Sequence, residues 1–266
     1  MARRRPLDPS YPGTKRAADP TAPGTARNRQ VEIAMLANRS QSANACELER
    51  RHHLPSRPVP GSPGRVLDLA VMFTDIEGFT QLAETLAPTL VARLLRGHFR
   101  LLARCIEGER GRIDKIMGDG LVAVWEARDQ AEACAGSLRA ALAIREALDA
   151  DNAGRVRRGQ PAIRVRLGVH VGPLVATPLD PAGRLGVALC GDTINVAQRL
   201  EQAARYVAAD ASVAALASAA VVTRAGAGFR FAEVGELPVR GRRDPVLAYE
   251  LLSAGTDHVA AEGRTV

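Results

Sequence analysis

Residues 66–80, VLDLAVMFTDIEGFT, decide the fold. Their first nine residues are almost all apolar, which predicts a buried strand. Asp75 follows that strand, and Gly78 and Thr80 open the next segment, which has helical periodicity. A carboxylate at the end of a buried strand, followed by a helix start, is typical of sites that bind cations and phosphates. Taken alone, Asp75 could equally be a turn or helix-capping residue.

Strand and helix patterns alternate outward from this stretch. Glycine, proline and periodicity signals predict helices at 80–107, 130–149 and 192–205, the last capped by Asp192 or Thr193. They predict strands at 66–74, 111–117, 121–125, 162–171, 221–223, 229–234 and 246–251. In the 162–171 strand, alternate apolar residues from Ile163 to Val171 share one face. The order β-α-β-β-α-β predicts an α+β, ferredoxin-like sandwich with extra C-terminal strands.

Composition divides the chain unevenly. Of its 266 residues 46% are hydrophobic and 24% charged, as in ordinary globular proteins. The first 65 residues hold 9 of the 16 prolines and 12 Lys/Arg against 5 Asp/Glu, which accounts for the net charge of +7. We therefore expect residues 1–64 to be a largely disordered basic segment and linker, 65–253 to be one folded domain, and 254–266 to be a flexible tail.

The sequence favours a cytoplasmic location. No stretch reaches the roughly 20 apolar residues that span a bilayer, and the Arg3–Arg5 start lacks the apolar run of a secretory signal. The four cysteines show no metal-ligand spacing, so we expect free thiols. The basic segment has almost no interleaved aromatic residues, and it indicates no clear nucleic-acid or membrane partner.

A second motif, KIMGDG, occupies residues 115–120. Two glycines around Asp119 predict a tight hairpin turn that could bring its carboxylate and backbone close to a ligand. The same triplet is also good turn chemistry with no ligand. Lys115 lies on an apolar strand, where it needs a partner or must extend to solvent.

A third motif, GDTINVAQRL, occupies residues 191–200. Asn195 and Arg199 are four residues apart, so they share one face of the predicted helix. That face could line a cleft, or it could be an ordinary solvated stripe.

Together and in this order, the three motifs resemble the signatures of class III adenylate and guanylate cyclases, over about residues 65–252. The resemblance implies a lyase that converts ATP to 3′,5′-cyclic AMP and pyrophosphate in signal transduction. It implies two Mg²⁺ or Mn²⁺ ions per active site, held by Asp75, Asp119 and the carbonyl of Ile76.

The remaining roles also follow from the resemblance. Lys115 would read the purine, while Asn195 and Arg199 would be catalytic, orienting the ribose and stabilising the transition state. Arg240, in the segment Val239-Arg240-Gly241, would reach the terminal phosphates. The residues whose backbone N–H groups could receive phosphate oxygens are Gly78, Phe79 and Thr80.

Two features of the resemblance qualify the function. In the family one chain supplies the metal aspartates and its partner supplies the Lys, Asn and Arg, so a homodimer with shared active sites is implied.

The second adenine-reading position, seven residues before Asn195, is Ala188, whose side chain cannot accept a hydrogen bond. The alternative is a cyclase-like nucleotide-binding regulatory module with weak or relaxed ATP/GTP turnover. A diguanylate cyclase is excluded, because the hairpin lacks the Gly-Gly-Asp/Glu-Glu-Phe sequence.

Overall fold

The computed structural model describes residues 64–179, 187–207, 211–239 and 242–255. All of them belong to one compact unit, Ala43–Val266. The predictions for the N-terminal segment, for Arg240 and for the tail beyond residue 255 lie outside the described residues.

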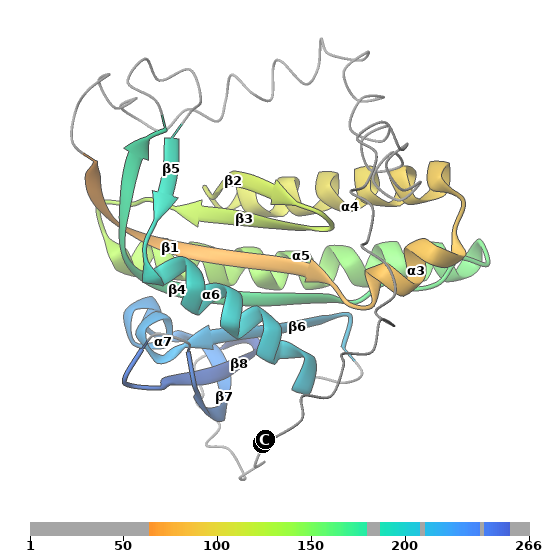
Figure 1. The fold of residues 1–266 in the computed structure, drawn as a ribbon. Helices are drawn as coiled ribbons and strands as arrows, with labels where there is room; N and C mark the ends of the chain where they lie inside the picture. The colour runs from red at the N-terminus through yellow and green to blue at the C-terminus, as the bar shows by residue number, and fades with distance from the viewer. Residues whose placement is uncertain (1–63, 180–186, 208–210, 240–241, 256–266) are drawn as a thin grey trace, which may run out of the picture. The chain divides into compact units, whose positions relative to one another are not determined.

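An eight-stranded sheet forms the centre of this unit, in the order β2-β3-β1-β4-β6-β8-β7, with β5 paired to β4 (Figure 1). β4 and β6 run parallel, and the other paired strands run antiparallel. The strands are β1 Arg65–Ile76, β2 Arg112–Met117, β3 Gly120–Trp125, β4 Val165–Pro178, β5 Val187–Cys190, β6 Val213–Ser218, β7 Gly228–Leu237 and β8 Val246–Gly255. The β2-β3-β1-β4 portion confirms the predicted βαββαβ core, and the later strands extend it.

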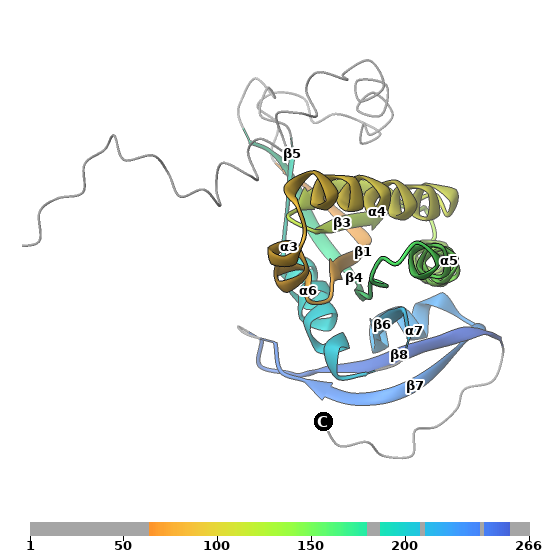
Figure 2. The same cartoon turned by 90° about the vertical axis from the view of Figure 1, so that its right-hand side faces the viewer.

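Helices cover the two faces of the sheet (Figures 1 and 2). On one face α4, α5 and α7 pack over the main core, and on the other α6 packs over β1, β4 and β6. The helices are α3 Phe79–Thr85, α4 Pro88–Gly108, α5 Gln130–Arg157, α6 Asp192–Ala203 and α7 Ala219–Ala225, with a 3₁₀ turn at Ala204–Tyr206. None of the helices in the described ranges is long and apolar enough to cross a bilayer.

β1 is buried on both faces, which explains its continuous apolar sequence. Ala70 and Met72 face the core beneath α4 and α5, while Leu69, Val71 and Phe73 face the opposite side. β1 is therefore clamped in the middle of the sheet, and its C-terminal end has little freedom to move.

β4 differs on its two faces. The alternating apolar residues from Ile163 to Val171 all join the main core, as predicted. On the opposite face, a Cβ added at Gly168 would lie 2.1 Å from the carbonyl oxygen of Ala197 and 2.2 Å from the amide nitrogen of Glu201. Gly168 thus allows the backbone of α6 to lie directly on the strand.

Two predicted elements were wrong. The single helix expected at 80–107 is two helices, because Pro88 cannot continue α3 and instead begins α4. The strand expected at 221–223 is helix α7, whose Val221 and Ala225 are one turn apart and buried. The sheet position is taken by the Ala-rich strand β6, which the sequence pattern did not reveal.

The predicted cap of α6 was also wrong. Gly191 is the N-cap residue, and no side chain caps the helix. Thr193 instead donates a hydrogen bond from Oγ1 to the carbonyl of Pro173, at 2.9 Å, which ties the start of α6 to β4.

The close approach of α6 to β4 gives a testable prediction. Gly168→Ala should lower the free energy of unfolding by about 1–3 kcal/mol, because its methyl group must displace backbone atoms of α6. Gly97→Ala is the matched control: apart from the chain neighbours and the backbone of its own helix, no atom lies within 4 Å of where a Cβ would be, and it should stabilise α4 by up to about 1 kcal/mol. Urea denaturation of the two variants measures the difference. Equal stabilities would contradict the proposed packing.

Candidate active site

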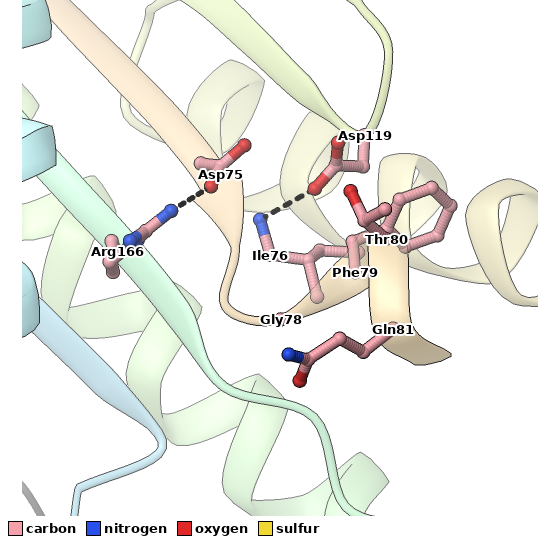
Figure 3. A pocket seen from close by; sticks show the side chains of 8 residues that line it. All are labelled: Asp75, Ile76, Gly78, Phe79, Thr80, Gln81, Asp119 and Arg166. Carbon is pink, nitrogen blue, oxygen red and sulfur yellow. Dashed lines mark hydrogen bonds and ion pairs between the residues drawn. The ribbon is translucent and has the colours of Figure 1, made fainter. Parts of the chain in front are cut away.

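Strand pairing brings Asp75 and Asp119 together at one end of β1. Thr74 pairs with Leu121 across the β1–β3 ladder, and the Leu121 N–H donates to Thr74 Oγ1 at 3.1 Å. The β2–β3 turn then places Asp119 beside the end of β1, where its Oδ2 accepts a hydrogen bond from the Ile76 N–H at 3.1 Å (Figure 3).

Gly120 is required for this approach. A Cβ on Gly120 would lie 2.1 Å from the carbonyl oxygen of Thr74, so any side chain would push the hairpin away from β1. The other glycine of the turn, Gly118, has a φ of 65°, a conformation that glycine adopts without strain. Each glycine of the Gly-Asp-Gly sequence is therefore required by the structure: Gly118 by its backbone conformation and Gly120 by its contact with β1. Together they place the carboxylate of Asp119 beside Asp75.

A pocket of about 280 Å³ opens between these carboxylates and the start of α3 (Figure 3). Its lining includes six of the residues predicted from the sequence: Asp75, Ile76, Gly78, Phe79, Thr80 and Asp119. Two further lining residues, Gln81 and Arg166, were not predicted. The chain turns from β1 into α3 at Gly78, whose φ of 69° is in the left-handed region.

Arg166 is the cation of the pocket. It is the direct cross-strand partner of Asp75 in the β1–β4 ladder, and its Nη2 donates to Asp75 Oδ2. Its Nε lies 3.1 Å from Glu201 Oε1 as an ion pair, without the alignment of a hydrogen bond. The sequence held only a weak signal for it: Arg164 and Arg166 both stand on the face of the predicted strand opposite its apolar residues.

Burial and mutual repulsion raise the pKa values of two carboxyl groups here. The pKa of Asp119 rises to about 6, first because the group is desolvated and second because Asp75 is close. The pKa of Glu201 rises to about 7, again through desolvation first and Asp75 second, while Arg166 opposes the rise. The carboxylates in and beside the pocket thus carry more negative charge than Arg166 alone neutralises, which favours the binding of a further cation.

The donor set fits a magnesium-type cation. Mg²⁺ prefers oxygen ligands, often one or two carboxylates completed by substrate phosphates and water. Asp75 and Asp119 supply two carboxylates, and the backbone of Ile76 lies between them in the pocket. No group of three or more His, Cys, Asp or Glu side chains able to hold a metal occurs in the described ranges. The remaining ligands would therefore come from the backbone, the substrate and water.

Four predicted residues do not line this pocket. Lys115 is exposed on β2, with its Nζ 3.7 Å from Asp114 Oδ2. Asn195 and Arg199 are exposed on α6, where Arg199 Nε donates to the carbonyl of Pro238 at 3.2 Å. Ala188 pairs with Thr177 in the β4–β5 ladder.

Comparison with known proteins gives the family. Residues 63–253 match the family described as "Adenylate and Guanylate cyclase catalytic domain", which is well over half of the chain. The chain belongs to this family.

Two relatives of this cyclase domain are adenylate cyclases by name. The chain is 33% identical over 190 residues to adenylate cyclase 1 of Rhizobium meliloti (strain 1021), covering 70% of this chain and 27% of that protein. It is 32% identical over 137 residues to the adenylate cyclase of Anabaena cylindrica, covering 50% of this chain and 26% of that protein. The chain thus spans about a quarter of the length of these relatives.

Solved structures share the fold. The adenylyl cyclase CyaB from P. aeruginosa superposes with a TM-score of 0.65 at 21% identity, covering 72% of this chain and 97% of that one. The guanylyl cyclase Cya2 superposes with a TM-score of 0.61 at 22% identity, covering 73% and 96%. The fold of this cyclase domain is therefore shared by a protein named as an adenylyl cyclase and by one named as a guanylyl cyclase.

The raised pKa of Asp119 predicts how stability depends on pH. An acid whose pKa is higher in the folded than in the unfolded protein favours folding below its unfolded pKa, and that contribution is lost as the pH rises through the folded pKa of about 6. In EDTA, Asp119→Asn should therefore lose less thermal stability than the wild type between pH 4.5 and 7.5. If the melting temperatures of the two proteins fell by the same amount between pH 4.5 and 7.5, the raised pKa of Asp119 would be refuted.

Proposed function

We propose that this domain is an adenylate cyclase that converts ATP to 3′,5′-cyclic AMP and pyrophosphate. One observation carries the proposal: Asp75 and Asp119 lie side by side at a pocket that also presents the guanidinium of Arg166. Two carboxylates suit divalent cations, and an arginine beside them suits the triphosphate that those cations accompany. The names of the two curated relatives support cyclisation of ATP in particular.

Seven of the eight residues that line the pocket then have a role. Asp75, Asp119 and the Ile76 carbonyl would hold two Mg²⁺ or Mn²⁺ ions, which when bound lower the pKa of the ribose 3′-hydroxyl and neutralise charge on the triphosphate. The backbone from Gly78 to Thr80 would receive phosphate oxygens, and Arg166 would bind the phosphates through charge-assisted hydrogen bonds. That second role requires Arg166 to give up part of its contact with Asp75.

A second copy of the chain would complete the site. Lys115, Asn195 and Arg199 are exposed and lie outside the pocket of their own chain, so they are accessible to a partner. Arg199 of the partner would stabilise charge on the reacting phosphorus, and its Asn195 would orient the ribose. A homodimer with two equivalent shared sites satisfies these roles, because each chain carries the two sets of residues.

Base selection would rest on Lys115. Ala188 cannot accept a hydrogen bond from the adenine amino group, so one base contact is missing. We therefore propose a preference for ATP over GTP that is weaker than a two-residue contact would give.

The first test compares two aspartates of β1. Asp75→Ala should abolish cyclic AMP formation by the purified chain with ATP and Mn²⁺, because it removes a cation ligand. Asp68→Ala is the control: Asp68 is exposed on the same strand, outside the pocket, and its removal should leave activity unchanged. A folded Asp75→Ala protein with wild-type activity would refute the proposal. Nucleotide binding by the wild type without any cyclic product would favour the regulatory-module alternative.

The second test concerns the shared site. Asp75→Ala and Arg199→Ala proteins should each be inactive, because each lacks one half of every site. When mixed, half of the dimers carry one intact site, so about a quarter of wild-type activity should return. Chemical crosslinking of differently tagged chains measures mixed-dimer formation. Mixed dimers without activity would contradict the shared arrangement.

A further inference from the structure

Glu201 is a buried carboxylate that the proposed chemistry does not use. It lies in α6 with 6% of its surface exposed, and its Oε1 is 3.1 Å from Arg166 Nε. Burying a carboxylate is costly unless a positive partner offsets the lost hydration. The burial of Glu201 therefore requires a positive partner, and Arg166 of the pocket is the one with which it forms an ion pair.

The backbone at Glu201 is fixed independently of its side chain. Its amide nitrogen lies 2.2 Å from where a Cβ on Gly168 would be, so α6 and β4 are in direct contact at this point. Arg166 is two residues before Gly168 on the same face of β4. The carboxylate of Glu201 thus meets the guanidinium at Nε, while Asp75 meets it at Nη2.

We infer that Glu201 is a positioning residue: its carboxylate shares the Arg166 guanidinium with Asp75, which weakens the hold of Arg166 on Asp75 and so eases the transfer of Asp75 to a divalent cation. This inference rests on the proposed function, because it takes the pocket to be a site for a cation and a triphosphate.

Charge balance gives the physical reason. The Arg166 guanidinium contacts two carboxylates, Asp75 and Glu201, and a third, Asp119, lines the same pocket as Asp75. Without the charge on Glu201, the only carboxylate that Arg166 contacts among the described residues is Asp75. Arg166 would then bind Asp75 without a competing carboxylate, and one negative charge beside the pocket would be lost. Each change weakens the binding of a divalent cation.

Manganese binding tests the inference without requiring turnover. Free Mn²⁺ is titrated by electron paramagnetic resonance against the full chain, without nucleotide, at pH 8.5, where Asp119 and Glu201 are ionised. Glu201→Gln should bind Mn²⁺ at least about tenfold more weakly than the wild type. Arg166→Gln should bind it more tightly, because the competitor for Asp75 is gone. The Glu201→Gln/Arg166→Gln double variant should return close to the wild type.

The double variant separates positioning from a merely structural role. If Glu201 only stabilised the fold, the double variant would bind Mn²⁺ as weakly as Glu201→Gln, or more weakly. Glu236→Gln is the control for net charge, since Glu236 is exposed on β7 and should leave the affinity unchanged. If Glu201→Gln does not fold, the comparison of Arg166→Gln with the double variant still decides the inference, because the former must bind Mn²⁺ more tightly.

Two outcomes distinguish this inference from the proposed function. An active cyclase whose Mn²⁺ affinity is the same in wild type and Glu201→Gln would overturn the inference alone. The predicted order of affinities in a chain that forms no cyclic nucleotide would overturn the proposed function and leave the positioning role of Glu201 supported.

Discussion

The position of β1 between β3 and β4 is the constraint on which the rest of the site depends. Its ladder with β3 pairs Thr74 with Leu121 and so brings Asp119 to the end of the strand. Its ladder with β4 pairs Asp75 directly with Arg166. A shift of either register by one residue would move these side chains to the opposite face of the sheet. The burial of β1 on its two faces opposes such a shift, because it would move each side chain into the opposite core, which is packed around different side chains.

The carboxylate pair could be predicted from the sequence because each aspartate has a local signal. Asp75 follows a continuous apolar strand, and Asp119 lies in a tight turn between two glycines. The ferredoxin-like core was predictable for the same reason, since its strands and helices have clear periodicity. The contact of Asp75 with Arg166 had no local signal, because it depends on the β1–β4 register. The contact of Arg166 with Glu201 depends in addition on how closely α6 lies on β4 at Gly168, which periodicity cannot show.

The failures of prediction have similar causes. The apolar spacing of residues 80–107 continues across Pro88, so the pattern predicted one helix where backbone chemistry requires two. Alanine-rich segments carry little information about strand or helix, so β6 was not predicted and part of α7 was predicted as a strand. These errors do not alter the pairing of β1 with β3, so the predicted site residues of β1 and its following turn still come together with Asp119 of the β2–β3 hairpin.

The central claim is that Asp75 and Asp119 form a cation site for a nucleoside triphosphate. Anomalous X-ray scattering from crystals grown with Mn²⁺ and a non-cyclising ATP analogue tests it most directly. The account predicts two manganese peaks, each coordinated by Asp75 and Asp119, with Arg166 turned from Asp75 towards the phosphates. Manganese bound elsewhere, with the Asp75–Arg166 ion pair intact beneath the bound nucleotide, would contradict it.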